Sequence, residues 1–440
     1  MRTFFILWLG QLASSIGSSM TYFALTLWVW QQTQSATAIA LILVFYQLPQ
    51  VVISPISGVL ADRLSRKHLL ILSDSGAACC TISVGILAGF QLLQIWHLYL
   101  IAAIIGCFGN LQALTYATVV PLIVPKRHHT RANSMGAMVG YGAGILSPAF
   151  AGILYPMIGL LGITAIDMGT FAIAILTLFF LKISPNRKNP LITSKESKTK
   201  ETKHTMWQEI TVGFRYITSQ PSLLVMVIAL SSFMFLEQIS ETLYQPMILA
   251  RTGGNTKTLG LVVAASGLGG VLGAIALSIW GGFRRRVVGM LVGFIGTGLS
   301  KFLFGLGRIS SVWVPTQFGA SLHHPLIFSS YMAIWYAKVP PNLQGRVFAA
   351  DYLVGTLIGA SASLSAGLLA DNVFEPAMQS HQSFASHLEI LVGAGEGNGM
   401  ALLIVISSLG MLLIGIGGFV IRRLRDAELL IPDHDSIAEA

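Results

Sequence analysis

Long apolar stretches, separated by short polar links, run along almost the whole chain. Each stretch is close to or above the about 20 residues that an α-helix needs to cross the hydrocarbon core of a bilayer. Apolar residues do not alternate with polar ones at every second position, which is the pattern of strands in a membrane β-barrel. The pattern predicts an all-α integral membrane protein with twelve transmembrane helices, at residues 4–30, 37–61, 69–90, 96–120, 134–155, 160–182, 222–249, 258–282, 287–306, 312–336, 347–370 and 398–421.

The composition agrees with a membrane protein. Charged residues make up 10% of the chain and hydrophobic residues 54%, whereas a soluble domain has about 25% charged residues. So few charges cannot cover a surface that faces water. The first apolar stretch is too long for a removable signal peptide and has few small residues of the cleavage-site type, so we assign it to the first helix.

A polar segment divides the twelve helices into two sets of six. Residues 184–204 are rich in lysine and poor in apolar side chains, which is typical of a linker. Beyond it, apolar residues recur at spacings of three and four and predict an amphipathic helix along the membrane surface: Trp207, Ile210, Phe214 and Ile217. We expect two six-helix bundles at 1–183 and 221–421, a cytoplasmic linker at 184–220 and a cytoplasmic tail at 422–440.

Positive charge is concentrated on one side of the predicted membrane. If the N-terminus is cytoplasmic, 23 of the 27 lysines and arginines fall on the cytoplasmic side. Cytoplasmic loops of membrane proteins carry such an excess, so we expect both termini inside, in a bacterial-type cytoplasmic (inner) membrane. The net charge of +9 then follows from topology. Because it is spread over loops that face one leaflet, it requires no nucleic-acid partner.

A charged pattern follows the second predicted helix. It consists of Gly58, Asp62, Arg63, Arg66 and Lys67, spaced as G-x-x-x-D-R-x-x-R-K. Between helices two and three of a six-plus-six layout, this spacing is similar to the loop 2–3 signature of the major facilitator superfamily. The whole chain most resembles the macrolide-efflux type of facilitator, within the drug:proton antiporter group that includes siderophore exporters. The segments that carry this likeness are "WLGQLASSIGSSMTYFALTLWVWQQTQSATAIAL", "GFRYI", "KVPPNLQGRVFA" and "GLLADNVFEPAM".

The resemblance implies that this charged pattern latches the cytoplasmic gate in the outward-open state. Helix eleven begins near Val347 on the same side, so its positive dipole end suits the carboxylate of Asp62. Gly58 permits two backbones to approach closely. Asp74, in helix three, could pair with one of the two arginines and complete the cluster. In the alternative interpretation the basic residues only set the topology, which leaves Asp62 and Gly58 unexplained.

Two features depart from the drug:proton antiporters. Their helix five often ends in G-P-x-x-G-G, whereas here "SPAFAG" keeps Pro148 and Gly152 but has Ser147 and Ala151 in place of glycines. Together with Gly144, the retained residues predict close helix packing. Many proton-coupled relatives also carry an arginine in helix four, and this helix has none. Proton coupling through that arginine is therefore not supported, and export as a direction depends on the overall likeness.

Ionisable residues inside predicted membrane helices are candidates for function, because burying them is costly. Glu237 and Glu241 lie four residues apart and share one helix face. We expect repulsion and low dielectric to let one of them hold a proton near neutral pH and release it to water. With a rise of about 1.5 Å per residue, Glu237 lies deep in helix seven. Glu241 falls near the outer interface, where solvation alone would explain it.

Four further residues carry ionisable groups in the membrane. Asp167, in helix six, would bind protons or substrate, or form a structural hydrogen bond to a neighbouring helix. His323 and His324 lie near the midplane of helix ten, and imidazole titrates near neutral pH. Since adjacent helical residues point about 100° apart, at most one histidine should line a cavity, and a hydrogen bond to a neighbouring helix is the alternative. Without a third ligand they predict no metal site. Lys301, in the peripheral helix nine, should snorkel outward.

Aromatic and amide side chains could line a central cavity that suits a bulky amphipathic solute, although most such residues serve packing or interfacial belts. They are Trp28, Trp30, Tyr46, Gln47, Tyr141, Phe235, Tyr244, Gln245, Tyr331 and Trp335. The chain contains no Walker A sequence, which argues against ATP as a direct energy source. It also shows no nucleophile–base arrangement, so we do not expect an enzyme.

We therefore predict a monomeric secondary active transporter without a cofactor. It would export a hydrophobic or amphipathic small molecule, such as a macrolide-like drug or a secondary metabolite, by alternating access around a site between two bundles. Protons would be the coupling ion, and the protein would be embedded in the lipid bilayer. One alternative is a lipid or lysolipid translocator. Another is a membrane sensor on a transporter scaffold, whose linker and tail would recruit a cytosolic partner.

Overall fold

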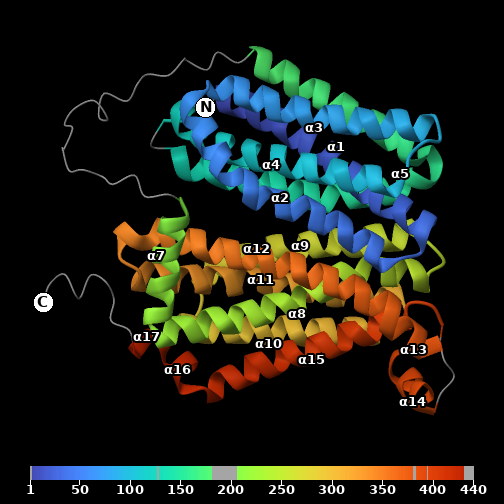
Figure 1. Cartoon of the computed structure of the whole chain (residues 1–440), viewed down its shortest axis with the longest axis vertical. Helices are drawn as coiled ribbons and strands as arrows, with labels where there is room; N and C mark the ends of the chain where they lie inside the picture. Colours follow the sequence, from blue (N-terminus) through green and yellow to red (C-terminus); the bar gives the residue numbers. More distant parts are fainter. Residues whose placement is uncertain (1, 126–127, 181–205, 380–382, 394, 431–440) are drawn as a thin grey trace, which may run out of the picture. The chain divides into compact units, whose positions relative to one another are not determined.

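The computed structural model describes residues 2–125, 128–180, 206–379, 383–393 and 395–430. All regular secondary structure in these ranges is helical (Figure 1). The long helices are α1 (Arg2–Thr33), α2 (Ala36–Arg63), α3 (Arg66–Gly89), α4 (Ile95–Ile123), α5 (His129–Phe180), α8 (Pro221–Arg251), α9 (Thr256–Trp280), α10 (Arg286–Leu306), α11 (Ser310–Lys338), α12 (Pro341–Leu369) and α15 (Asn398–Val420). The shorter ones are α7 (Met206–Ser219), the π-helix η2 (Ala370–Phe374), α13 (Glu375–Gln379), α14 (Ser383–Val392), α16 (Arg422–Arg425) and α17 (Ala427–Leu430).

Each predicted transmembrane segment coincides with a helix to within a few residues over the described ranges. The fifth and sixth segments share α5, which is broken at Gly159, where φ is 63° and ψ is −170°. Only glycine adopts this backbone conformation without strain. Nine of the described helices are long and apolar enough to cross a membrane. Helices α1 and α11 are not among the nine, because both carry many Ser, Thr and Gln residues.

Backbone contacts divide the chain into two compact units. Unit 1 comprises residues 1–21, 45–143 and 160–209, and unit 2 comprises residues 22–44, 144–159 and 210–440. Most of the first six predicted helices thus belong to unit 1. The C-terminal part of α1 and the N-terminal part of α2, within residues 22–44, and the middle of α5, residues 144–159, belong to unit 2. The linker that the sequence predicts at 184–220, between two six-helix bundles, lies partly outside the described residues. This division of the chain stays a prediction.

Unit 1 is built from several small apolar clusters. One consists of the fully buried side chains of Leu7, Leu70, Val119 and Leu178. Helix α3 packs along α4, and a glycine permits close packing at another crossing. A Cβ on Gly106 of α4 would lie 2.2 Å from the main-chain oxygen of Tyr46 in α2. Small residues at such crossings let membrane helices approach to backbone contact.

Unit 2 has a larger continuous core, made by α8, α10, α11, α12 and α15. The rings of Phe233 and Phe294 stack at its centre, with a centroid distance of 4.1 Å. Trp335 of α11 and Met411 of α15 are completely buried in the same cluster. This packing fixes the rotation of α8, α10 and α11 about their axes, and thereby determines which polar residues these helices turn toward one another.

Helix α5 crosses α9 at glycines within unit 2. A Cβ on Gly152 would lie 2.7 Å from the main-chain oxygen of Thr256, and a Cβ on Gly260 would lie 2.6 Å from that of Pro148. Gly144 lies farther along the same crossing, also against α9. The glycines and the proline that the sequence suggests for packing in helix five thus lie where the two backbones touch.

One end of unit 2 combines α7, α16 and α17 (Figure 1). Ile217 of α7 is buried in the core, while Phe214, which the spacing places on the same face, is exposed, so α7 buries only part of this face against its own unit. The side chains of the predicted residues Trp207 and Ile210 lie outside the described part. From α16, Leu424 is buried in the core, so the start of the tail packs against its own unit.

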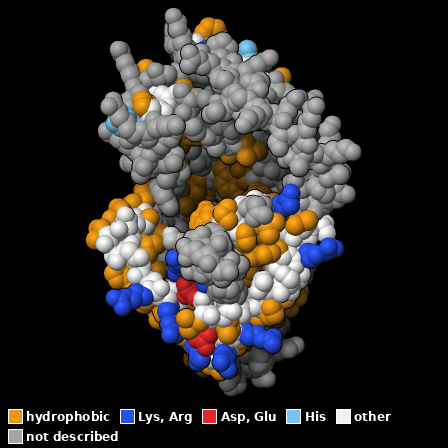
Figure 2. Space-filling model, turned by 90° about the vertical axis from the view of Figure 1, so that its left-hand side faces the viewer, with side chains coloured by type: hydrophobic (Ala, Val, Ile, Leu, Met, Phe, Trp, Pro, Cys, Tyr) orange, Lys and Arg blue, Asp and Glu red, His pale blue; other side chains and the backbone are white. Residues whose placement is uncertain are grey.

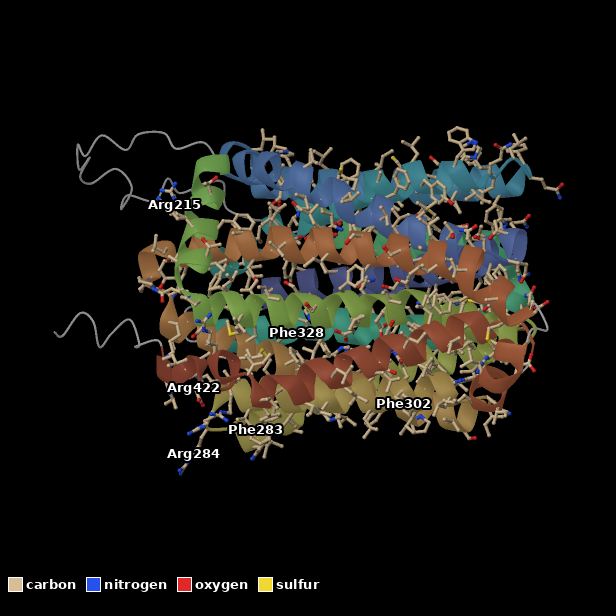
Figure 3. The ribbon with its side chains drawn as sticks, turned by 60° about the horizontal axis from the view of Figure 1, so that its bottom comes forward. Arg215, Phe283, Arg284, Phe302, Phe328 and Arg422 are labelled. Carbon is tan, nitrogen blue, oxygen red and sulfur yellow. The ribbon has the colours of Figure 1, made fainter. Side chains whose placement is uncertain are left out.

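The same end of unit 2 is strongly basic. Figure 2 faces it and shows Lys and Arg side chains scattered over the described surface of this unit. In Figure 3, Arg215, Arg284 and Arg422 extend from this end. The exposed arginines there are Arg215, Arg284, Arg285, Arg422, Arg423 and Arg425.

Candidate functional site in the membrane helices of unit 2

Helix α8 presents two carboxylates, one turn apart, to its neighbours. Glu237 and Glu241 lie on one face of α8, because residues four apart in an α-helix lie one above the other. Glu237 is 4% exposed as a residue. The two carboxylates do not share one environment, since each contacts a different basic side chain. The repulsion expected from their spacing is therefore offset by two separate partners.

Glu241 pairs with Lys301 of α10. The Lys301 Nζ lies 2.5 Å from the Glu241 Oε1 and also donates to the Gln317 Oε1 at 2.8 Å. The rings of Tyr244 and Phe304 lie 5.1 and 5.4 Å from the same nitrogen, which is within cation–π range. Lys301 is 0% exposed. This ammonium is therefore enclosed by a carboxylate, an amide and two aromatic faces.

Two expectations from the sequence are corrected by this pair. Lys301 does not snorkel outward, because α10 packs against α11 and α15 and its ammonium contacts the Glu241 carboxylate of α8 and the Gln317 amide of α11. Glu241 is not explained by solvation alone, because its carboxylate is neutralised by the lysine. The sequence did not reveal the pairing, since it depends on how two helices distant in the chain are rotated against each other.

Glu237 pairs with His324 of α11. The His324 Nε2 contacts the Glu237 Oε1 directly. The histidine side chain is 28% exposed and the glutamate side chain 5%, so the exposed side of the pair is the histidine. His323 instead contacts the main-chain oxygen of Gly319, one turn earlier in its own helix, through Nδ1 at 2.7 Å. Of the two histidines, only His324 joins the carboxylates of α8.

Neutral polar groups extend the site to α9. The Gln317 Nε2 donates to the Glu241 Oε1 and to the Ser266 Oγ, both at 3.4 Å. The Ser266 and Ser321 hydroxyls lie 2.6 Å apart. The site thus spans α8, α9, α10 and α11.

Of the α11 residues in the site, His324 is predicted from the sequence, but Gln317 and Ser321 are not. Gln317, Ser321 and His324 recur at spacings of four and three, which places them on one helix face. This periodicity was a readable signal in the sequence, because it aligns three polar residues along one face of the helix. Ser266 of α9 had no comparable signal.

Unit 1 contains a separate buried acid, Asp167, in the second part of α5. Its carboxylate accepts hydrogen bonds from the hydroxyls of Ser18 at 3.2 Å, Thr21 at 2.9 Å and Thr81 at 3.0 Å. The donors come from α1 and α3, so Asp167 ties three helices together. These hydrogen bonds are the kind expected if Asp167 has a structural role between neighbouring helices. A role in proton or substrate binding stays a prediction.

Among the described residues of unit 1, Asp74 of α3 is the other buried acid. Gln11 of α1 donates to it at 3.1 Å, and Gln112 of α4 contacts it as well. The side chains of Arg63 and Arg66 lie outside the described part, so their pairing with Asp74 stays a prediction.

The charged pattern after the second membrane segment spans the junction of α2 and α3. Asp62 is in the last turn of α2, and Arg66 begins α3, which Ser65 caps by accepting from the main-chain nitrogen of His68. Lys67 donates to the main-chain oxygen of Phe179 at 3.0 Å. The side chains of Asp62 and of the two arginines lie outside the described part, so the latch expected there stays a prediction.

The geometry can be compared with known proteins. Residues 7–364 match the model of the Major Facilitator Superfamily. The chain belongs to this family. It is therefore a multi-pass membrane transporter for a small molecule and not an enzyme.

Relatives with assigned names are distant. The chain is 27% identical to an uncharacterized MFS-type transporter, YfiS, of Bacillus subtilis, over 82% of this chain and 85% of that protein. It is 24% identical to macrolide efflux protein A of Streptococcus pyogenes, over 84% and 89%. The enterobactin exporter EntS of Salmonella typhimurium is also 24% identical, over 70% and 71%.

Solved structures support the fold. A bacterial homologue of the human lysosomal transporter Spinster, in an inward-facing and unoccupied conformation, matches with a TM-score of 0.66. The match covers 97% of this chain and 96% of that one, at 14% sequence identity. At this identity the likeness concerns the fold alone, and it agrees with the predicted all-helical architecture.

Proposed function

We propose that the protein exports a hydrophobic or amphipathic small molecule in exchange for protons. The observation that carries this proposal is the contact between Glu237 and His324, an acid and a base on different membrane helices of unit 2. An exchanger needs a group that can take up a proton and whose charge affects the arrangement of helices. This pair meets both requirements.

A proton that joins or leaves this pair changes its net charge. With Glu237 ionised and His324 protonated, the pair is neutral overall. If His324 loses its proton, a buried carboxylate remains without a cation, and if Glu237 gains one, an imidazolium remains without an anion. Either state is costly in a low-dielectric interior. Protonation is therefore coupled to whether α8 and α11 stay together or admit water, which is a shift between two conformations.

The neighbouring pair of Glu241 and Lys301 has a different role. Lys301 is completely enclosed, and each pair has one side chain that is 28% exposed, Glu241 in this pair and His324 in the other. Exposure therefore does not separate the two pairs, but an imidazole exchanges protons near neutral pH far more readily than an ammonium does. We assign proton exchange to Glu237 and His324, and the fixed pair beside them holds α8 and α10 in register.

The direction and location of transport are inferred from charge and from relatives. Two distant relatives are named as a macrolide efflux protein and an enterobactin exporter, which supports export of bulky organic compounds. The basic end of unit 2 carries α7, α16 and α17. Positive charge marks the cytoplasmic side, so this end would face the cytoplasm of a bacterial inner membrane.

Transport in liposomes tests the proposal. The protein is reconstituted with an imposed pH gradient, and flux of a panel of macrolides, dyes and siderophores is compared with that of Glu237→Gln. We expect gradient-driven flux in the wild type and its loss in the variant, with substrate binding retained. Glu396→Gln, at an exposed carboxylate outside the site, is the matched control and should transport normally.

Two outcomes would contradict the proposal. Gradient-driven flux that is unchanged in Glu237→Gln would exclude this residue as the proton carrier. Lipid movement in the same liposomes without any gradient would instead identify the protein as a lipid translocator.

A further inference from the structure

At the end of unit 2 opposite α7 (Figure 1), a carboxylate from one helix caps the start of another. Asp371, in η2 directly after α12, accepts hydrogen bonds from the Ser35 hydroxyl at 2.6 Å and from the main-chain nitrogens of Ala36 at 3.0 Å and Thr37 at 2.8 Å. Ala36 and Thr37 begin α2. An α-helix leaves its first N–H groups without partners, and its N-terminus attracts negative charge. Asp371 satisfies both needs of α2.

A glycine one turn earlier brings the two helices into backbone contact. A Cβ on Gly367 of α12 would lie 2.6 Å from the Cα of Thr37 and 3.0 Å from the Cβ of Ala40. No other residue type would leave room for α2 at this distance. The contact therefore uses a glycine for approach and, four residues later, an aspartate for attachment.

The same pattern occurs at the end of α2. Residues 58–62 read GVLAD and residues 367–371 read GLLAD, identical at four of five positions. Each copy lies at the C-terminal end of its helix. The second copy holds the N-terminus of α2. For the first copy, the sequence predicts that Asp62 meets the N-terminal end of the segment that forms α12.

We propose that Gly367 and Asp371 form an outer latch that holds α2 to α12 when the transporter is closed on the outside. It is the counterpart of the expected inner latch at Gly58 and Asp62, and the two hold the same pair of helices at opposite ends in turn. This inference rests on the proposed function, because only a carrier that alternates requires two gates. The latches lie about 40 Å apart along α2, from a rise of about 1.5 Å per residue, so one can open while the other closes.

A neighbouring acid provides a matched control. Glu375, four residues after Asp371, accepts from the main-chain nitrogens of Gly397 at 3.3 Å and Met400 at 2.8 Å, at the start of α15. Helices α12 and α15 both belong to the second set of six. Glu375 therefore caps a helix that need not separate from α12 during transport, whereas α2 belongs to the first set and must separate.

The latch can be tested by a distance measurement that needs neither substrate nor proton gradient. In a chain whose three cysteines are replaced by serine, spin labels are attached through Gln32→Cys and Gln379→Cys, both exposed positions near this end. We expect a short distance to dominate in the otherwise unchanged protein. Asp371→Asn and Gly367→Val should raise the ratio of long to short distances by about tenfold or more.

Control variants separate a latch from a general effect on folding. Glu375→Gln should leave the distance distribution unchanged. If Asp371→Asn fails to fold, Ser35→Ala removes one of the three hydrogen bonds and should give a smaller shift in the same direction. The proposal is overturned if folded Asp371→Asn or Ser35→Ala leaves the distribution unchanged, or if Glu375→Gln shifts it equally. A shift in distance without gradient-driven flux would leave the latch standing while removing the proposed proton exchange.

Discussion

At the scale of single residues, the most informative side chain is a lysine with no access to solvent. Lys301 contacts Glu241 and Gln317 and is flanked by two aromatic rings. A buried charge that loses its partner retains its desolvation cost without the compensating attraction. The pair should therefore respond very differently to the loss of one member and to the loss of both.

We predict that Lys301→Met destabilises the protein by about 3 kcal/mol, the lower end for a broken buried pair, because Glu241 stays partly exposed. Thermal unfolding in detergent measures the change. The double variant with Glu241→Gln should recover most of the loss, since no unpaired charge remains. Lys257→Met, at an exposed lysine, should unfold like the wild type. A double variant no more stable than the single one would refute this interpretation.

The two adjacent histidines should behave differently. His324 contacts Glu237, whereas His323 contacts a carbonyl of its own helix. We predict that His324→Gln lowers pH-gradient-driven flux by about tenfold or more, the effect of losing about 1.4 kcal/mol of coupling. His323→Gln should keep most of the flux. Initial rates in proteoliposomes with and without a gradient check this, and equal losses in both variants would contradict it.

The sequence predicts which residues are unusual better than it predicts their partners. Glu237, Glu241 and His324 stand out because ionisable groups are rare in apolar helices. Their pairing depends on the rotation of α8, α10 and α11, and the large apolar side chains of the core set that rotation. Lys301 illustrates the limit, because its snorkelling was inferred from the peripheral place of its helix and not from its neighbours.

At the scale of helices, backbone crossings at glycine should tolerate no added side chain. We predict that Gly152→Ala or Gly260→Ala lowers stability by about 1–3 kcal/mol, as overpacking does, because each Cβ would approach a main-chain oxygen of the facing helix within 2.7 Å. Gly417→Ala is the matched control, since a Cβ there meets no atom within 4 Å. Thermal unfolding in detergent compares them. An effect in Gly417→Ala as large as in the other two would show that helix crossing is not the cause.

Helix positions follow closely from the apolar pattern, and so does the break in α5. Gly159, where α5 is interrupted, falls in the gap between the predicted segments at 134–155 and 160–182. The π-helix after α12, which carries Asp371, had no sequence signal. It depends on local backbone geometry that apolar periodicity does not encode.

At the scale of the whole molecule, the excess of positive charge on one side of the membrane predicts the orientation of the chain in the bilayer. With the native cysteines replaced by serine, Arg284→Cys at the basic end should be labelled by an impermeant maleimide only in inside-out vesicles. Lys257→Cys, in the first turn of α9, should be labelled only in right-side-out vesicles. The physical reason is that arginine-rich loops are retained in the cytoplasm. Labelling of both positions from the same side would overturn the orientation.

The start of the tail affects how the second unit can be completed. Leu424 and Ala427 are buried in its core, and Lys338 donates to the main-chain oxygen of Glu428 at 2.6 Å. These residues follow α15, the last long helix of the unit. A nascent chain inserts its helices in order, but the core of this unit stays open until the residues of α16 and α17 have been made. The second unit should therefore reach its final stability only once these two short helices have folded onto it, and a fusion joined directly after Ile421 would leave that core unfilled.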